Sequence, residues 1–491
     1  MRRKTFVSFN LIVKIAPLFQ SLRREVVCRI DGSDKGDAVI TRRRMFQFGL
    51  AAGLLTAGQT NAAPALLQAQ MRGTINGKDA NLIPQTGKNR APELLALIDA
   101  AREDDQWVFL PPGRYEIAGL ELPDRTRLAG VAGATTLVFS GGDRFVQAQG
   151  KNRIELTNIV FDGADRPLPA SAPALLSIFD TVNLTIENCE FRRCAKTAIQ
   201  AERCAGRIEQ CQVSGVGEYA VYAIDSEGLA IVDNRIDRCG NGGILVHRRN
   251  KGEDSSIVTG NRITNTGASY GGTGQFGNAV NIYRADGVIV SGNHILNSAF
   301  SAIRANAASN VQISGNQCIS SGETAIYSEF GFEGALVQGN LVDKAANGIS
   351  IANFNEGGRL AVVANNIVRN ISLSGPYIHD SVGFGIGIGV EADTVVSNNV
   401  IENVPRWGML VGWGPYLRNV VITANIIRKA RIGCAVSVAE EPEGALINGN
   451  LFDETPDGAI IGFLWHDAVT GELATGGGQF SHLTIEGNRL T

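Results

Sequence analysis

The feature that most constrains the fold is a motif of about 23 residues that recurs along most of the chain. Its shortest copy, from Asn293 to Asn316, has three short segments separated by polar turns. These segments alternate apolar and polar residues, as in 348–351, which is typical of strands rather than helices. The residue that opens each copy, an Asn or the one Cys that replaces it, is placed at Asn158, Asn188, Cys211, Asn234, Asn261, Asn293, Asn316, Asn340, Asn366, Asn399, Asn425, Asn450 and Asn488.

Repetition with this period predicts a parallel β-helix, in which three strands form one rung and each rung buries its inward side chains on the next. Spacings above 23 residues then correspond to loops inserted into a fixed rung. We therefore predict an all-β fold, a single parallel β-helix over residues 107–491. The recurring Asn side chains are expected to stack as a structural ladder, so they are not counted as candidate functional residues.

Residues 1–63 have a different pattern and are predicted to be a leader. Arg43, Arg44 and Phe46 precede a short apolar run, 48–58, and then small residues around Ala63. These are the parts of a secretory signal, and the paired arginines resemble a twin-arginine signal. The run falls short of the roughly 20 residues that span a membrane. We expect export by the twin-arginine machinery to the periplasm or the exterior, with no membrane span in the mature chain. Residues 1–40 are either an over-extended start or a long n-region.

Charge and cysteine content narrow the possible partners. The leader holds 11 basic and 4 acidic residues, which leaves 34 basic and 44 acidic residues, a net charge of about −10, in the remainder. An acidic chain without a basic block argues against nucleic acid as a partner. The seven cysteines after the leader have no zinc-site spacing and are expected to be buried free thiols. We predict no metal and no cofactor.

The segment 64–106 is predicted to hold one helix, over residues 92–102. Pro92 suits a first helical turn, and an apolar face follows at helical spacing. The residues of that face are Leu94, Leu95, Ile98 and Ala101. We expect this helix to cover the first rung, whose open edge would otherwise promote aggregation.

The helix, the turn Phe109-Leu110-Pro111-Pro112-Gly113-Arg114-Tyr115 and the Gly-Asn rungs together resemble the right-handed β-helix proteins of the pectin-lyase-like superfamily. With its leader, the chain is similar to a family of bacterial twin-arginine-translocated repeat proteins of undefined role. The resemblance implies a right-handed β-helix and export. It implies no chemistry, because the motifs of polygalacturonases and pectate lyases are missing. The four residues 377–380 are weakly similar to the His-containing loop of alginate epimerases and lyases.

The insertions predict a groove. They fall before the middle strand of the rung (165–174, 269–278 and 372–384) and after it (247–256, 353–359 and 463–480). Insertions in repeat proteins often map to the binding face. We therefore expect two walls with the middle strand as the floor. The alternative is that solvated loops simply tolerate extra length.

Alternate residues of the middle strand face outward and form the two rows of the predicted floor. The first row is Gln200, Tyr222, Leu245, Asn281, Arg304, Tyr327 and Ser350, and the second is Glu202, Ile224, His247, Tyr283, Asn306 and Glu329. Tyrosine rings beside polar groups suit a sugar. The predicted substrate-binding residues are Tyr222, Asn281, Arg304, Tyr327 and Arg248.

The charged groups of the floor suggest a chemistry. Arg304 with His247, Arg248 and Arg249 is expected to pair with a uronate carboxylate. Glu329 or His247 is the candidate proton donor or acceptor, with Tyr283 close by. A second-choice cluster is His379, Asp380 and Glu391. The alternative is that all of these are ordinary solvent-facing residues.

Three functions follow as alternatives. The first is an exported enzyme acting on a polysaccharide as a lyase, hydrolase or epimerase. The second is a non-catalytic scaffold that binds glycan or envelope material. The third is a structural role, because the last rung, 483–490, is not followed by a helix. Either the insertion 463–480 or another molecule, such as a second copy in a homo-oligomer, is expected to cover that edge.

Overall fold

The computed structural model describes residues 73–80, 82–84, 86–272, 274–378, 382–440, 442–475 and 480–491. The described residues belong to the second of two units into which the chain divides, residues 73–491. The predicted signal residues, Arg43, Arg44 and Phe46, lie outside the described residues, and so do His379 and Asp380.

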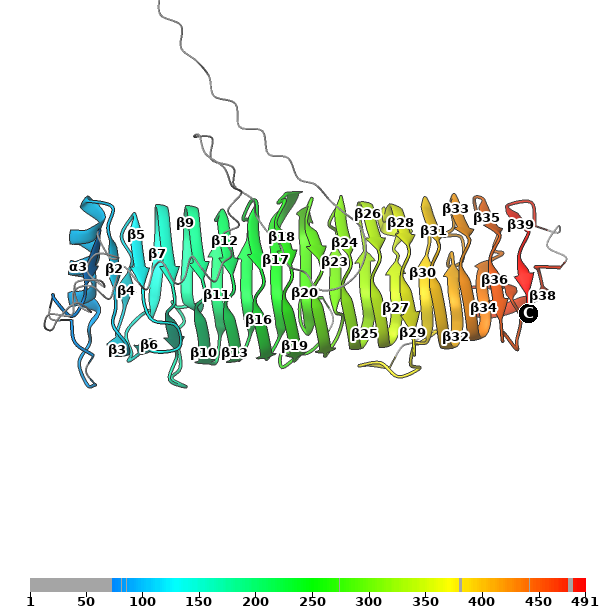
Figure 1. Cartoon of the computed structure of the whole chain (residues 1–491). Coiled ribbons are helices and arrows are strands. Elements are labelled where there is room, and N and C mark those ends of the chain that lie inside the picture. Colours follow the sequence, from blue (N-terminus) through cyan, green and yellow to red (C-terminus); the bar gives the residue numbers. More distant parts are fainter. Residues whose placement is uncertain are drawn as a thin grey trace, which may run out of the picture. The chain divides into compact units, whose positions relative to one another are not determined.

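The second unit is a right-handed parallel β-helix built from short strands, as predicted (Figure 1). Its opening rungs hold β1 (Thr74–Asn76), β2 (Trp107–Phe109), β3 (Gly113–Ile117), β4 (Leu120–Glu121), β5 (Thr126–Ala129), β6 (Thr135–Phe139), β7 (Val146–Thr157), β8 (Val160–Asp162) and β9 (Ala174–Glu187). Each later rung has a first, a middle and a third strand, and each strand pairs in parallel with its counterpart one rung on.

The first strands of these rungs are β10 (Glu190–Cys194), β13 (Gln212–Val216), β16 (Arg235–Cys239), β19 (Arg262–Thr266), β22 (His294–Ser298), β29 (Ile367–Arg369), β36 (Leu451–Asp453) and β40 (Arg489–Leu490). The middle strands are β11 (Thr197–Glu202), β14 (Tyr219–Ile224), β17 (Gly242–Glu253), β20 (Asn278–Asp286), β23 (Ile303–Asn306), β30 (Ile386–Val390) and β37 (Ile460–Leu464). Four long strands run through the first and middle positions without a break, namely β25 (Gln317–Glu329), β27 (Leu341–Ile351), β32 (Val400–Val411) and β34 (Ile426–Ser437).

The third strands are β12 (Gly206–Glu209), β15 (Leu229–Val232), β18 (Ile257–Thr259), β21 (Ile289–Ser291), β24 (Val311–Ser314), β26 (Glu333–Gln338), β28 (Arg359–Ala364), β31 (Thr394–Ser397), β33 (Val420–Thr423), β35 (Ala445–Asn448) and β39 (Leu483–Glu486). The inward side chains of all three stacks form one continuous apolar core. The seven cysteines of the described residues are free and buried, as predicted, and pack as small hydrophobes.

The asparagine ladder stabilises one corner of the β-helix. Each side-chain oxygen accepts hydrogen bonds from the backbone N–H and the Nδ2 of the Asn one rung earlier, as Asn340 does from Asn316 at 2.9 and 3.0 Å. The ladder is continuous through Asn234, Asn261, Asn293, Asn316, Asn340, Asn366, Asn399, Asn425, Asn450 and Asn488. All ten side chains are buried or partly buried, so this polar corner is satisfied from within the chain.

The prediction was wrong by one residue at the start of the ladder. Backbone pairing places Ile159 and Cys189, not Asn158 and Asn188, in register with Cys211. Asn158 and Asn188 instead occupy the left-handed turn position just before, with φ of 59° and 48°. There, the half-buried side chain of Asn158 accepts a hydrogen bond from the exposed side chain of Asn188 at 2.7 Å. Short polar side chains suit this conformation, which explains why an Asn recurs there too.

Both ends of the β-helix are covered by segments of the same unit. At the N-terminal end, α3 (Ala91–Glu103) buries Ala91, Leu94, Ile98 and Ala101 against the core, where the sequence predicted a capping helix. At the other end, β38 (Asp467–Glu472) pairs antiparallel with β37, and Leu473 and Phe480 of the same insertion pack against the core. β38, Leu473 and Phe480 therefore cover part of the last rungs, whereas Leu490 of β40 is 41% exposed. A homo-oligomer remains a prediction.

Candidate functional site

The strand register assembles the two predicted rows of the floor. In the first row, Tyr222 pairs with Leu245, Leu245 with Asn281, and so on through Arg304 and Tyr327. In the second row, the pairing runs from Glu202 through Ile224, His247, Tyr283 and Asn306 to Glu329. These rows define the floor. Because neighbouring strands lie about 4.8 Å apart, Tyr222, Tyr283 and Tyr327, each two rungs from the next, recur about every 10 Å.

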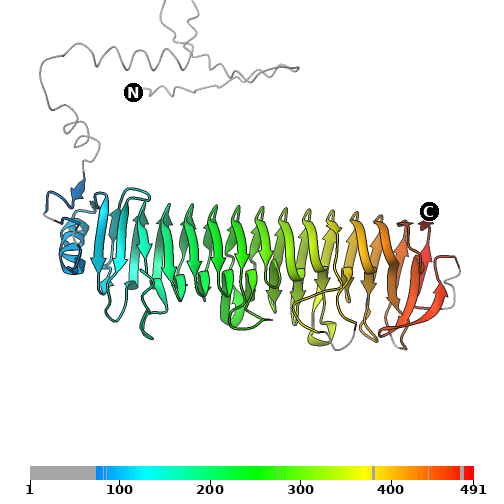
Figure 2. The same cartoon turned by 90° about the horizontal axis from the view of Figure 1, so that it is seen from below.

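One side of the floor is bordered by two of the insertions, which meet at the ring of Phe300. The ring of Phe300 fills the space beside Gly272 and Gly277 of the first insertion, where a Cβ atom would collide with the ring. The same ring stacks on Tyr377 of the next insertion, with 6.4 Å between ring centroids. Figure 2 shows that irregular segments from well-separated parts of the chain project along one edge of the β-helix. Phe300 thus links two of the three insertions that were predicted to form this wall.

A buried ionic cluster lies at the centre of the floor. Arg304 donates from Nε and NH2 to the two oxygens of Glu329, at 2.6 and 3.0 Å, and from NH1 to Glu323 at 3.3 Å. Asn306 donates to Glu329 at 2.8 Å, and the Tyr377 hydroxyl donates to Glu323 at 2.7 Å. Two carboxylates therefore share one guanidinium. We call Arg304, Glu323 and Glu329 the ionic cluster.

The burial of this cluster differs from the prediction of a solvent-facing floor. Arg304 is 6% exposed, and Glu323 and Glu329 are each 2% exposed. Tyr327, over whose ring the guanidinium of Arg304 lies at 5.1 Å, is itself only half-buried, and burial raises the pKa of its hydroxyl. The charged groups are thus held beneath aromatic rings and the 372–384 insertion. The oxygens of Glu329 are occupied by Arg304 and Asn306, which leaves the proton-transfer role predicted for Glu329 without support from this geometry.

His247 forms a second buried group, two strands from Arg304 on the floor. Its Nε2 lies 2.6 Å from Oδ1 of Asn281, and the Asn281 amide in turn donates to the backbone oxygen of Gly274 at 3.2 Å. The rings of Tyr222 and Tyr283 flank the imidazole, with centroids at 5.2 and 5.5 Å. Burial lowers the pKa of His247 to about 4. The imidazole is therefore neutral at pH 7 and serves as a hydrogen-bonding spacer between two tyrosine rings.

This environment gives His247 a defined effect on stability. The folded protein resists protonation of His247 until about pH 4, whereas the unfolded chain takes up the proton near its ordinary pKa of 6.5. As the pH falls from 6.5 to about 4, the free energy of unfolding should therefore decrease by about 1.4 kcal/mol per pH unit because of this residue alone. We expect His247→Gln to remove that contribution. Urea unfolding of both proteins at pH 7.5 and 5.0 measures it, and equal pH dependence in the two would contradict it.

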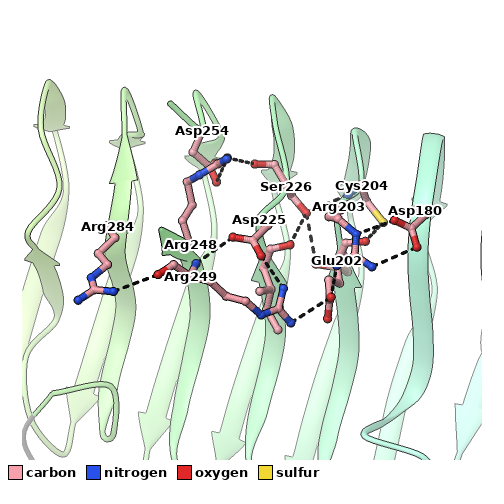
Figure 3. A network of polar contacts seen from close by, with 12 residues as sticks. Asp180, Glu202, Arg203, Cys204, Asp225, Ser226, Arg248, Arg249, Asp254 and Arg284 are labelled. Carbon is pink, nitrogen blue, oxygen red and sulfur yellow. Dashed lines mark hydrogen bonds and ion pairs between the residues drawn. The ribbon is translucent and has the colours of Figure 1, made fainter. Parts of the chain in front are cut away.

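The border of the floor beyond the second row carries a ladder of arginines and carboxylates (Figure 3). Arg249 pairs with Asp225 at 2.5 Å and with Glu202 at 3.0 Å. Arg248 donates to the backbone oxygen of Ser226 at 3.3 Å, and its charge lies 3.9 Å from buried Asp254. These arginines and Arg304 already have carboxylate partners, and His247 is neutral. The predicted pairing of these four residues with a uronate therefore finds no free cation among them.

The second-choice cluster can be placed only in part, because Glu391 alone lies among the described residues. Glu391 follows Val390, which pairs with Ile351, so it continues the second row beyond Glu329. Its carboxylate accepts the backbone N–H of Phe354 at 2.6 Å, and burial raises its pKa to about 7. A carboxyl group with this pKa is able to exchange a proton near neutral pH.

Sequence reasoning missed several residues of the site. Glu323 lies outside the two rows, and Tyr377 was noted only for its position beside His379. A third group, Trp413, Tyr416 and Trp465, forms an aromatic cluster at the far end of the same border, with ring centroids 5.6 and 6.3 Å from Trp465. Trp465 is 45% exposed. The sequence does contain a signal for this cluster, because Trp465 lies in a predicted insertion and Trp413 and Tyr416 lie together in one turn.

Cavities lie elsewhere on the described unit. A hollow of about 490 Å³ is lined by residues of the first-strand stack, among them Cys194, Val216 and Cys239, and another of about 780 Å³ lies near Phe452 and Leu490. Among the described residues, no group of three or more His, Cys, Asp or Glu side chains could hold a metal ion. The helices within the same residues include none long and apolar enough to cross a membrane.

Comparison with known proteins identifies the architecture. The model of the right handed beta helix region matches residues 197–368. No curated protein sequence matches the chain significantly. A PL6 alginate lyase solved with a trisaccharide is 12% identical, with a TM-score of 0.50 over 85% of this chain and 95% of the lyase. The N-terminal fragment of bacteriophage phi29 gene product 12 is 14% identical, with a TM-score of 0.48 over 82% and 71% of the two chains.

A third similar structure is the A-module of the mannuronan C-5 epimerase AlgE6 from Azotobacter vinelandii. It is 15% identical, with a TM-score of 0.40 over 85% of this chain and 99% of the module. At such identities the likeness to the lyase establishes the fold alone, and the two lower scores add no argument. The function therefore has to be argued from the floor itself.

Proposed function

We propose that the protein binds a polysaccharide chain along the floor, with the sugar chain crossing the stacked middle strands. The observation that carries this proposal is the regular recurrence of Tyr222, Tyr283 and Tyr327 at every second rung. All three are half-buried, and none of their hydroxyls bonds to another of the described residues. A ring for the apolar sugar face beside a free hydroxyl is the combination that sugar recognition uses.

A second candidate is that the floor also acts on the bound chain as a lyase, hydrolase or epimerase. Glu391 favours it, because a carboxyl with a pKa of about 7 is suited to acid or base catalysis. Two observations favour binding alone. Both oxygens of Glu329 are occupied by Arg304 and Asn306, and the low pKa of His247 makes it a weak base. Assaying reducing ends and unsaturated products in every binding experiment separates the two candidates.

Tyr283→Ala tests the binding site. The ring of Tyr283 lies between His247 and the guanidinium of Arg284, 4.9 Å away, so its position is fixed before a ligand arrives. Loss of one stacking ring, at about 1–1.5 kcal/mol, should weaken binding about tenfold. The measurement is the dissociation constant from affinity electrophoresis in gels containing a panel of polysaccharides.

Ile426→Ala provides the matched control, because Ile426 is an exposed side chain of the first-strand stack, away from the floor. We expect this variant to bind like the original protein. If Tyr283→Ala binds each polysaccharide that retains the original protein with unchanged affinity, the floor is not the binding site. If no polysaccharide retains the original protein, the glycan-binding function fails.

We further propose that the protein meets this glycan outside the cytoplasm. Support comes from the leader, in which Arg43, Arg44 and Phe46 precede a short apolar run. An exported protein of net negative charge would be placed among envelope or extracellular polysaccharides. A non-catalytic scaffold and an enzyme are both compatible with that location.

A further inference from the structure

Most of the positive charge of the floor and its border is held in ion pairs, and negative charge is in excess. Over the floor and border segments 180, 202–203, 225–227, 247–254, 284–286, 304–306 and 323–329, the basic side chains are Arg203, Arg248, Arg249, Lys251, Arg284 and Arg304, and the carboxylates are Asp180, Glu202, Asp225, Glu227, Glu253, Asp254, Asp286, Glu323 and Glu329. Figure 3 shows how arginines and carboxylates of this ladder alternate across neighbouring strands.

The best-buried cation illustrates the consequence. Arg304 donates from Nε and NH2 to Glu329 and from NH1 to Glu323, so each of its three guanidinium nitrogens already has a carboxylate acceptor. A uronate that took over Arg304 would leave two nearly fully buried carboxylates without their counter-charge. Removing one partner of a buried pair is strongly unfavourable. The incoming carboxylate would also add a third negative charge to the same place.

The border repeats this arrangement. Arg203 forms an ion pair with Asp180 at 2.6 Å, and Arg249 forms ion pairs with Asp225 and Glu202. Arg284 donates instead to the backbone oxygen of Arg249 at 3.0 Å and covers the ring of Tyr283. Lys251 donates to the backbone oxygen of Gly331 at 2.6 Å. A polyanion approaching the floor would therefore meet net negative charge and engaged cations.

We propose that the ligand of the floor is an uncharged polysaccharide and that the ionic cluster rejects polyuronates. This inference rests on the proposed glycan-binding function and names its substrate class. The groups of the two rows that are left for a ligand are neutral: the rings and hydroxyls of Tyr222, Tyr283 and Tyr327. Binding of an uncharged chain to such groups should change little with salt, whereas binding of a polyanion is screened by it.

The test uses pairs of polymers that differ only in charge. Polygalacturonate, alginate and glucuronoxylan are each compared with their own carboxyl-reduced form, in which each uronate has become a neutral hexose. Binding is measured by affinity electrophoresis at 20 and 300 mM NaCl. We expect at least one reduced polymer to bind tenfold or more tightly than its charged parent, with little effect of salt. Equal or tighter binding of the charged parent would overturn the inference and leave glycan binding intact. If no member of any pair binds, the proposed function fails and the inference fails with it.

A variant of the floor that gains binding to polyuronates provides a second, independent test of the inference. Glu323→Gln/Glu329→Gln leaves the charge of Arg304 uncompensated while keeping side-chain shape, so polygalacturonate and alginate should be retained at least tenfold more strongly than by the original protein. The control Glu187→Gln/Glu209→Gln makes the same change in net charge on the third-strand stack, where these two residues pair in register. Equal gains in both double variants, or no gain in a floor variant whose circular dichroism and melting temperature are those of the original protein, would refute the rejection mechanism.

Discussion

Replacing Arg304 by methionine is expected to lower the free energy of unfolding by about 3–5 kcal/mol at pH 7. The substitution keeps much of the side-chain volume but removes the only charge that both Glu323 and Glu329 contact in the ionic cluster. Two like charges would then be buried side by side without compensation.

Urea denaturation of the original protein and the variant at pH 7 measures this effect. The triple variant Arg304→Met/Glu323→Gln/Glu329→Gln is the control, since it removes the charges together and should recover most of the loss at pH 7. A loss of equal size in the single and triple variants would show that packing of the Arg304 side chain matters and its charge does not.

Asn340→Ala is expected to cost about 3–5 kcal/mol, for a different reason, since it leaves several buried polar groups unpaired. The oxygen of Asn340 accepts two hydrogen bonds from Asn316, and its Nδ2 donates to Ile313 O and to Asn366 Oδ1, each at 3.0 Å. Water does not reach these groups readily, because Asn316, Asn340 and Asn366 are each 1% exposed. Thermal and urea unfolding both measure the loss.

Asn488→Ala is the matched control within the same ladder. Asn488 lies in the last rung, is partly buried, and donates only to Ile447 O while accepting from Asn450. Its replacement should cost less than half as much, because the groups that it leaves are nearer to water. Equal losses at both positions would mean that burial does not set the strength of the ladder.

Much of the architecture could be predicted from the sequence because a β-helix repeats one local rule. Alternation within strands of fixed spacing decides which residues face outward, so the rows from Tyr222 to Tyr327 and from His247 to Glu329 could be read before the structure. The ladder was misplaced only at its start, where Asn158 and Asn188 occupy the left-handed turn position one residue before the corner.

The charge state of the floor could not be predicted in the same way. Glu323 reaches Arg304 from outside the two rows, and Tyr377 reaches Glu323 from an insertion 54 residues further along the chain. Such contacts depend on how loops fold back over the sheet, which the periodicity of the rungs does not encode. The sequence therefore indicated which residues form the floor, whereas the ion pairs of Arg304 became visible only in three dimensions.

A crystal structure of the protein with a neutral oligosaccharide chosen from the tightest-binding polymer would show the ligand site directly. We predict sugar rings along the floor, in contact with Tyr222, Tyr283 and Tyr327, and an ionic cluster in which Arg304 is still paired with Glu323 and Glu329. An oligosaccharide bound on the first-strand or third-strand stacks, with the three tyrosines unoccupied, would contradict this prediction.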